Sequence, residues 1–323
     1  MSRSAFDPTE PTLTNPQADR VRAVHGLGQR AARRRSGQYL VEGPQAVREL
    51  VRWSPERVRD VYLTPDAAAR YPEIVTDSAA LFRHVGTPEV LAAMSADAQG
   101  VLAVATVPGA EPAQGSERGS STQGPEHGPS TRAPGRGPST PAPARGPLTA
   151  EALPGLLATG PRLIALLARV RDPGNLGTVI RVADAAGADA VVIAGDAVEV
   201  TNPKVVRSTA GSLFHLPVVH GLPVEDAVRA LRAAGSQVLA ADGAGTLDLD
   251  DLQDAAALGD DRGPVDLRRP TAWLFGNEAW GLPAEDRDLA DAVVRVPLRG
   301  HAESLNLATA AAVCLYASSR AHR

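Results

Sequence analysis

Short apolar runs alternate with amphipathic stretches in the first part of this 323-residue chain. Apolar residues in short runs predict strands, and apolar residues three or four positions apart predict helices. By this pattern, strands cover residues 38–41, 58–63, 81–85 and 100–107, and helices cover residues 44–53, 65–71 and 88–94. The pattern indicates a small α/β domain, which we place at residues 16–107. Residues 1–15 are polar and are expected to be disordered.

The same alternation returns on a larger scale in residues 153–323. Predicted strands cover residues 163–168, 190–194, 237–241, 271–275 and 292–296, and predicted helices cover residues 176–186, 203–211, 224–234 and 304–320. Alternating strands and helices predict a mostly parallel sheet with helices on both faces. Ligands of such sheets bind beyond the carboxyl ends of the strands. The pattern assigns no element to residues 243–270.

A stretch rich in proline and glycine separates the two parts. Nine prolines and eight glycines, and no aromatic residue, occur between residues 108 and 150. Such a composition cannot bury enough apolar surface to offset the entropy lost on ordering. We therefore predict a disordered linker over residues 108–152.

The composition excludes several classes of protein and site. Cys314 is the single cysteine, so a disulfide framework and a cysteine-based metal site are excluded. No other cluster has metal-ligand spacing, and we predict no metal site. The chain lacks an apolar signal core near its start and an apolar stretch long enough for a membrane span. A cytoplasmic protein is expected.

Positive charge is concentrated near the start of the chain although the net charge is −4. Six arginines and one acidic residue, Asp19, lie between residues 17 and 40. The pattern is compatible with a basic helix over residues 17–35. A solvated helix face and a surface that binds RNA phosphates both explain the arginines, and we favour RNA binding.

Polar residues without an obvious packing role follow three of the predicted strands of the second domain. They lie in residues 172–175 after the first strand, 276–278 after the fourth and 297–306 after the last. Since the carboxyl ends of parallel strands share one edge, these stretches are expected to converge on a candidate active site. The candidates are Asn175, Arg181, Asn277, Glu278, Ser304 and Asn306.

Structural roles compete with chemical ones for several of these residues. Asn175 and Ser304 are suited to capping the helices that they precede, and Glu278 to a surface ion pair. Arg181 lies between apolar neighbours on a helix that is expected to be largely buried. A buried cation needs a partner or a polyanion, which makes Arg181 the strongest functional candidate.

The three stretches resemble, in order, the three motifs of the SpoU (TrmH-type) RNA ribose methyltransferases. They read N-L-G-T-V-I-R from Asn175, F-G-N-E-A-W-G-L from Phe275 and P-L-R-G-H-A-E-S-L-N from Pro297. Residues 206–217 are similar to the segment that connects the first two motifs in this family. Residues 30–43 and 99–104 resemble its N-terminal RNA-binding accessory domain.

The resemblance implies a specific fold and specific partners. The second domain is expected to carry a SPOUT-like trefoil knot, to bind S-adenosylmethionine and to form a homodimer. Implied cofactor contacts are Phe275, Gly276, Asn277, Val296, Leu298 and Leu305. Implied catalytic or substrate residues are Asn175, Arg181, Glu278, Ser304 and Asn306. Phosphate contacts are expected from Arg30, Arg33, Arg34 and Arg35.

The resulting hypothesis is an enzyme that methylates a ribose 2′-hydroxyl of RNA, with ribosomal RNA favoured over transfer RNA. Arg181 is either the general base or a cation that holds a phosphate and the developing alkoxide, because a guanidinium does not readily lose its proton. A non-catalytic RNA-binding protein is one alternative. A nucleotide-dependent oxidoreductase is another, but the turn D-P-G-N-L-G lacks its glycine fingerprint. An antibiotic-resistance methyltransferase would share the same chemistry.

Overall fold

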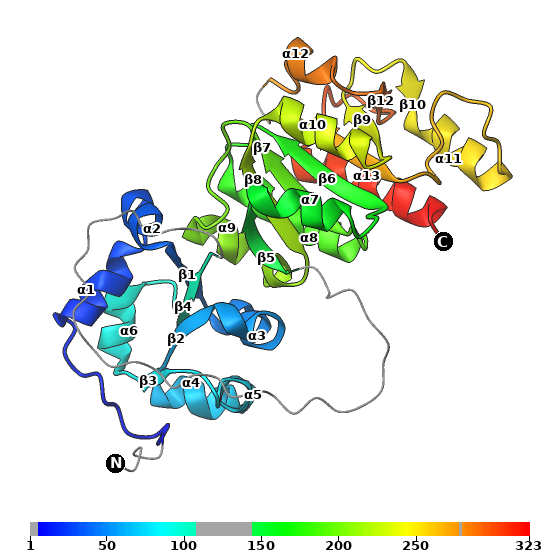
Figure 1. Ribbon diagram of the computed structural model, residues 1–323. Helices are drawn as coiled ribbons and strands as arrows, with labels where there is room; N and C mark the ends of the chain where they lie inside the picture. Colours follow the sequence, from blue (N-terminus) through cyan, green and yellow to red (C-terminus); the bar gives the residue numbers. More distant parts are fainter. Residues whose placement is uncertain (1–5, 108–143, 278–279) are drawn as a thin grey trace.

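Two β-sheets organise the chain, each in its own α/β domain (Figure 1). The computed structural model describes residues 6–107, 144–277 and 280–323. We call residues 6–107 the N-terminal domain and residues 144–323 the C-terminal domain. Among the described residues, no helix has the length and apolar character needed to cross a membrane.

The N-terminal domain contains a mixed four-stranded sheet in the order β1-β4-β2-β3. Strands β1 and β2 are antiparallel to β4, and β3 is parallel to β2. The strands are β1 (Gln38–Glu42), β2 (Val58–Leu63), β3 (Arg83–Val85) and β4 (Val101–Thr106). The helices are α1 (Asp19–Gly26), α2 (Arg30–Ser36), α3 (Pro44–Trp53), α4 (Pro65–Arg70), α5 (Pro72–Asp77) and α6 (Pro88–Met94), with a short 3-10 turn η1 (Pro55–Arg57).

The N-terminal domain differs from its sequence-based description in three places. The basic segment forms two helices, α1 and α2, because a turn at residues 27–29 interrupts it. A second helix, α5, follows α4, since Pro72 cannot continue α4 but is suited to the first turn of a new helix. Leu13 pairs in parallel with Gly86, so part of the segment expected to be disordered extends the sheet.

The C-terminal domain is built on an eight-stranded sheet in the order β10-β12-β9-β11-β6-β7-β8-β5. All of its strand pairs are parallel, which confirms the predicted type of sheet. The strands are β5 (Gly146–Thr149), β6 (Leu163–Ala168), β7 (Ala190–Ala194), β8 (Pro217–Leu222), β9 (Gln237–Ala241), β10 (Leu247–Asp248), β11 (Thr271–Phe275) and β12 (Ala292–Arg295). The helices are α7 (Leu153–Leu157), α8 (Pro173–Ala185), α9 (Pro203–Ser208), α10 (Val224–Ala233), α11 (Leu249–Leu258), α12 (Ala284–Arg287) and α13 (Leu307–Ala321), with 3-10 turns η2 (Ala150–Ala152) and η3 (Ser212–Phe214).

The domain begins before residue 153, where we had placed its start. Residues 108–143 of the predicted linker lie outside the described residues, but residues 146–149 form β5. This strand contains Pro147, which an edge strand tolerates because one side of its backbone needs no partner. Strand β8 was also missed, and residues 243–270, which had no assignment, contain β10 and α11.

Helices cover both faces of this sheet because alternate residues of its central strands point to opposite sides. In β6, Leu163, Ala165 and Leu167 face α8 and α13, and the residues between them face α7 and α10. Within the core, Trp273 Nε1 donates to Ser318 Oγ at 2.9 Å, so the buried indole N–H is satisfied. Cys314 is fully buried as predicted, and burial raises the pKa of its thiol to about 12.

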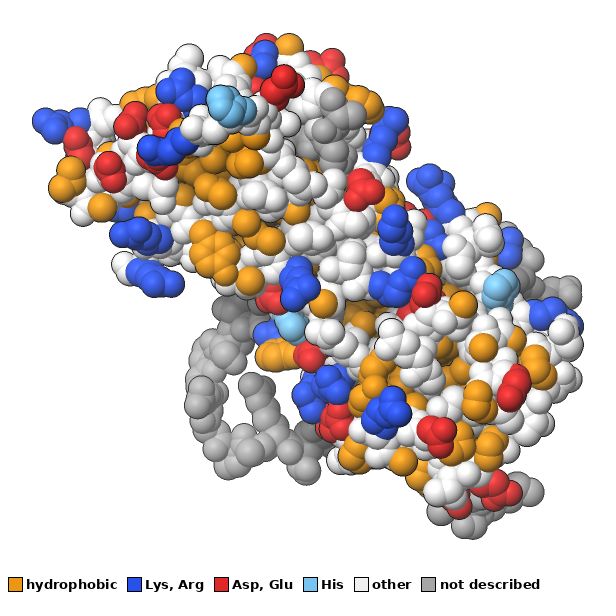
Figure 2. Space-filling view, turned by 180° about the vertical axis from the view of Figure 1, so that it is seen from behind, with side chains coloured by type: hydrophobic (Ala, Val, Ile, Leu, Met, Phe, Trp, Pro, Cys, Tyr) orange, Lys and Arg blue, Asp and Glu red, His pale blue; other side chains and the backbone are white. Residues whose placement is uncertain are grey.

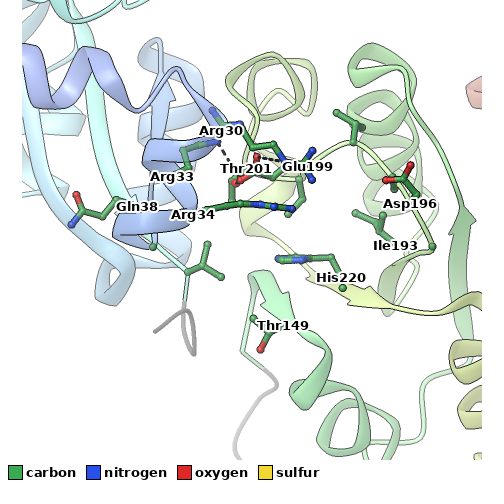
Figure 3. Close-up of a pocket in the computed structure, with 17 residues that line it drawn as sticks. Arg30, Arg33, Arg34, Gln38, Thr149, Ile193, Asp196, Glu199, Thr201 and His220 are labelled. Atoms are coloured by element: carbon green, nitrogen blue, oxygen red, sulfur yellow. Dashed lines mark hydrogen bonds and ion pairs between the residues drawn. The ribbon is translucent and has the colours of Figure 1, made fainter. Parts of the chain in front are cut away.

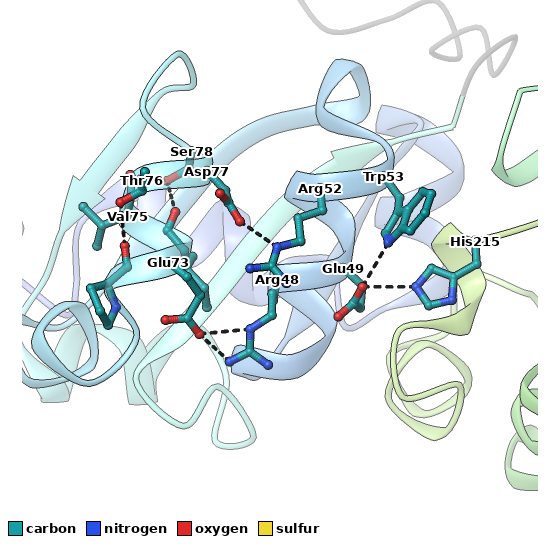
Figure 4. Close-up of polar contacts among 12 residues, drawn as sticks. Arg48, Glu49, Arg52, Trp53, Glu73, Val75, Thr76, Asp77, Ser78 and His215 are labelled. Carbon is teal, nitrogen blue, oxygen red and sulfur yellow. Dashed lines mark hydrogen bonds and ion pairs between the residues drawn. The ribbon is translucent and has the colours of Figure 1, made fainter.

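Ionic and polar contacts join the two domains. Arg207, in the last turn of α9, pairs with the buried Glu42 of β1. Glu49 of α3 accepts from His215 at 3.2 Å and from Trp53 Nε1 at 3.1 Å (Figure 4). The two domains are thus docked through side-chain contacts of α9 with β1 and of His215 with α3.

Candidate active site

The first polar stretch forms the turn between β6 and α8. Asp172 caps α8, because its Oδ1 accepts the backbone N–H of Asn175 at 2.7 Å. The possibility that Asn175 itself caps the helix is therefore wrong. Gly177 permits close packing of α9, since an added Cβ would lie 1.9 Å from Ser208 Oγ.

The first and third stretches meet at a pair of asparagine side chains. Asn306 Nδ2 donates to Asn175 Oδ1 at 2.9 Å. Asn306 also caps α13, with Oδ1 accepting from the N–H of Ala308 at 2.9 Å. The cap that we had considered for Ser304 therefore belongs to Asn306, and Ser304 is left exposed.

The second stretch forms a tight turn after β11. Asn277 and Gly281 exchange two backbone hydrogen bonds of 2.9 Å each. Gly276 has no room for a side chain, because an added Cβ would lie 2.4 Å from the carbonyl carbon of Gly281. Asn277 is buried, and its Nδ2 donates to the carbonyl oxygen of Arg169 at 3.0 Å. Glu278 lies outside the described residues.

Arg169, which the sequence did not single out, connects this turn to α12. Its backbone has φ of +57°, a region that residues other than glycine seldom occupy. Its guanidinium binds the buried Asp286 at 2.7 and 3.1 Å and the exposed Glu285 at 2.9 Å. These bonds hold the backbone in the conformation that presents its carbonyl oxygen to Asn277.

A cavity of about 290 Å³ lies where the second and third stretches meet. It is lined by Ala241, Asp242, Gly243, Trp280, Gly281, Val296, Leu298, Glu303, Ser304, Leu305 and Ala310. Of the predicted cofactor contacts, Val296, Leu298 and Leu305 line it. Phe275, Gly276 and Asn277 do not line it but are buried in the strand and turn beside it.

Sequence reasoning missed two useful residues of this cavity. Asp242 follows β9, and the rule that ligands bind beyond carboxyl ends of strands would have indicated it. Trp280 lies within the second stretch and is largely exposed, which is unusual for so large an aromatic side chain. Together with Glu303, they give the cavity one aromatic wall and two carboxylates.

Arg181 does not lie where its apolar neighbours indicated. Its side chain is on the exposed face of α8 and does not line the cavity described above. It forms no ion pair with a described residue. The expectation that Arg181 is buried, and therefore needs a partner, is wrong. Val313 and Tyr316 of α13 are also exposed, and Tyr316 Oη donates to the carbonyl oxygen of Ala185 on α8 at 3.2 Å.

The four arginines predicted to contact phosphate fall into two groups. Arg30, Arg34 and Arg35 are exposed. Arg33 is only 4% exposed, with Nη2 donating to Glu199 Oε2 at 2.7 Å and Nη1 donating to the carbonyl oxygen of Gly28 at 2.8 Å. In this arrangement Arg33 holds the two domains together and does not face solvent.

Comparison with protein families and curated sequences places these features in a known context. Residues 162–316 match the model of the SpoU rRNA Methylase family. Over 161 residues the chain is 42% identical to the 23S rRNA (uridine(2479)-2'-O)-methyltransferase of Streptomyces viridochromogenes, covering 48% of this chain and 51% of that protein. It is also 42% identical over 161 residues to the 23S rRNA (guanosine(2553)-2'-O)-methyltransferase RlmP of Bacillus subtilis strain 168, covering 50% and 58%. The match thus spans about half the length of these curated relatives.

Solved structures resemble the chain over both domains. The SpoU methyltransferase AviRb of Streptomyces viridochromogenes in complex with AdoMet has a TM-score of 0.66 and 29% identity, covering 94% of this chain and 98% of that one. An AdoMet-bound rRNA methyltransferase of Sinorhizobium meliloti has a TM-score of 0.68 and 25% identity, covering 97% and 98%.

Proposed function

Because residues 162–316 form a domain of the SpoU methylase family, we propose that this protein transfers a methyl group from S-adenosylmethionine to a ribose 2′-hydroxyl of ribosomal RNA. The observation that carries the proposal is the convergence of three separate stretches on one edge of the sheet, where Asn306 bonds to Asn175 beside the cavity. The curated relatives named as 23S rRNA 2'-O-methyltransferases support the substrate class. The proposed site of action is the cytoplasm.

The cavity residues fit the proposed cofactor. Val296, Leu298 and Leu305 offer an apolar surface to a heterocyclic base, and Trp280 offers an aromatic one. Asp242 and Glu303 supply carboxylates suited to ribose hydroxyls and to a cation. When bound, S-adenosylmethionine supplies an electrophilic methyl group. The buried residues Phe275, Gly276 and Asn277 shape the turn that limits the cavity.

Besides binding the cofactor, the protein must orient the ribose and assist loss of its hydroxyl proton. Asn175, Ser304 and Asn306 present amide and hydroxyl groups at this edge of the sheet and are suited to hold the ribose. Arg181 acts as a cation that attracts the adjacent phosphate and the developing alkoxide. Glu278 is also proposed as a catalytic or substrate-binding residue.

A homodimer through the C-terminal domain accompanies this proposal. Thr178, Arg181 and Ala185 form an exposed row on α8, beside the exposed Val313 and Tyr316 of α13. Seen from behind, the surface of the C-terminal domain carries a group of hydrophobic side chains (Figure 2). A second copy packed on this face would cover the apolar side chains and place Arg181 at the interface. The trefoil knot is proposed with it, on the same family resemblance.

Calorimetric titration with S-adenosylmethionine is the first test. The wild-type protein and a Leu258→Arg control, changed at a highly exposed site on α11 outside the cavity, are expected to bind the cofactor. Leu298→Arg, changed at a partly exposed cavity residue, is expected to lose binding while remaining folded. Methyl transfer from labelled cofactor to ribosomal RNA and to transfer RNA follows, with the modified ribose located by its resistance to alkaline hydrolysis. A folded wild-type protein that binds no cofactor would support the non-catalytic alternative.

A further inference from the structure

A second cavity, of about 410 Å³, lies between the two domains (Figure 3). Helix α2 of the N-terminal domain forms one wall through Arg30, Arg33 and Arg34. The opposite wall lies at the carboxyl ends of β7 and β8 and includes Glu199 and His220. The cavity therefore opens on the sheet edge at which ligands of parallel sheets bind. The proposed cofactor site does not use this cavity, although Arg30 and Arg34 are among the arginines expected to contact phosphate.

Both acidic residues that line this cavity are already paired, Glu199 with Arg33 and Asp196 with Arg171. Glu199 accepts from Arg33 at 2.7 and 3.3 Å and from Thr201 Oγ1 at 2.9 Å. Arg30 is farther away, with its Nε at 3.8 Å from Glu199 Oε2. Arg34 forms no ion pair with any residue that the structure describes. The exposed guanidinium of Arg34 thus remains available to an anion, and the exposed Arg30 has only a long contact with a carboxylate that Arg33 already binds.

His220 supplies a polar atom that is unpaired within the described part of the chain. Its Nε2 is buried and has no hydrogen-bond partner among the described residues. Burial lowers the pKa of the imidazole from its ordinary value of 6.5, so the ring is neutral at pH 7. A neutral imidazole nitrogen can donate or accept one hydrogen bond, according to the tautomer. Figure 3 shows His220 and Arg34 reaching into the same space from the two domains.

We propose that this cavity binds one unpaired nucleotide of the RNA substrate, with Arg30 and Arg34 at its phosphates and His220 Nε2 at its base. The proposal rests on the function proposed above, since it takes RNA as the ligand. Arginine binds phosphate oxygens in a fork geometry, and unpaired RNA bases are commonly held in pockets that read their hydrogen-bonding edges. Thr149 also lines the cavity, on the side of the C-terminal domain.

A row of contacts connects this cavity to the proposed cofactor site. Asp196 lines the interdomain cavity and accepts from Arg171 Nη2 at 3.1 Å. The guanidinium of Arg171 lies 5.5 Å from the centre of the Trp280 ring, and Trp280 lines the other cavity. An RNA strand that places one nucleotide between the domains could therefore follow this edge towards the methyl donor. The cavity would set the distance between a recognised nucleotide and the methylated one.

Fluorescence anisotropy with a fluorescein-labelled hexaribonucleotide of random sequence tests the proposal. Arg34→Ala is expected to weaken binding about five- to tenfold and to reduce the dependence of log K on log salt by roughly 0.7, the value for one phosphate contact on a single strand. The control is Arg70→Ala, which removes an exposed arginine of α4 that does not line the cavity, and it is expected to change binding less than about twofold.

His220→Phe keeps a ring in the cavity but removes Nε2. It is expected to reduce the spread of affinities among oligo(A), oligo(C) and oligo(U) hexamers, because a hydrogen bond to the base is lost. Equal effects of Arg34→Ala and Arg70→Ala would overturn the proposal, and this result does not depend on the folding of the His220 variant. Cofactor binding measured on the same proteins separates the two proposals. If Arg34→Ala alone loses RNA binding and the wild-type protein binds no S-adenosylmethionine, the proposed nucleotide site is supported and the proposed methyltransferase function is contradicted.

Discussion

Asn306 Nδ2 donates a hydrogen bond of 2.9 Å to Asn175 Oδ1, and the two residues lie 131 positions apart in the chain. One bond thereby joins the turn after β6 to the start of α13. Asn306 has a second role, because its Oδ1 caps α13. The two functions of this one side chain can be separated by substitution.

Asn306→Asp is expected to retain the cap of α13 and to lose the bond that Asn306 Nδ2 donates to Asn175 Oδ1, because a carboxylate accepts hydrogen bonds and cannot donate one. Asn306→Ala loses both, and we expect it to be about 1 kcal/mol less stable than Asn306→Asp. Methyl transfer should fall in both variants. Urea unfolding and transfer of labelled methyl groups measure the two effects. Equal stability of the two variants would show that the cap contributes nothing.

Arg169→Gly is expected to weaken cofactor binding. Glycine accepts the φ of +57° without strain, so the substitution removes the bonds to Asp286 and Glu285 and little else. The buried Asp286 then lacks this partner, which costs on the order of 1–3 kcal/mol of unfolding free energy. The turn held through Asn277 should also become more mobile.

Arg171→Ala is the matched control for Arg169→Gly in the stability measurement. The ion pair of Arg171 with Asp196 is exposed on both sides, so its loss should change the unfolding free energy by less than about 1 kcal/mol. Urea unfolding gives the stabilities, and calorimetric titration gives the affinity of Arg169→Gly for S-adenosylmethionine. A similar loss of stability in both variants would contradict the role assigned to Arg169.

The contact between Glu49 and His215 is expected to couple the domains energetically. His215 lies between two carboxylates, with Nδ1 at 2.8 Å from Asp184 and Nε2 at 3.2 Å from Glu49. Figure 4 shows the contact with Glu49. A double-mutant cycle of Glu49→Ala and His215→Ala should give a coupling of about 0.5–2 kcal/mol in urea unfolding. The exposed pair of Glu225 and Arg229 on α10 should give less than about 0.5 kcal/mol. Equal couplings would mean that the interdomain contact is no stronger than a surface pair.

Protonation of His220 is expected to destabilise the protein in acid. The folded-state pKa of His220 is below its ordinary value of 6.5, because burial disfavours the charged ring. Its contribution to stability is therefore present above pH 6.5 and is lost as the pH falls through the folded-state pKa, by at most about 1.4 kcal/mol per pH unit. His220→Phe should flatten this part of the pH profile of urea unfolding. A pH profile of unfolding that is steeper in His220→Phe than in the wild-type protein would contradict a lowered folded-state pKa for His220.

Local sequence information was sufficient for the central elements of both domains. Strands over residues 163–168, 190–194, 237–241 and 271–275 were predicted with the bounds observed, because central parallel strands are apolar along nearly their whole length. The alternation of strands and helices also predicted the parallel sheet of the C-terminal domain and the edge at which its polar residues gather. The edge strand β5 was missed, because its Gly146 and Pro147 have the composition of the linker before it, and its pairing with β8 depends on a segment about 70 residues away.

Side-chain environments depended on contacts that sequence alone does not specify. Apolar neighbours made Arg181 appear buried, but adjacent residues on a helix point in different directions, and Arg181 faces outward. Arg33 looked like its neighbours in a basic run, but the other domain covers it. The sequence by itself determined the order of elements, the family resemblance and the three motif stretches, because these depend on local periodicity and on residue identity. The tertiary structure alone decided which side chains meet, because the bond between Asn175 and Asn306 and the cavity between the domains arise from segments far apart in the chain.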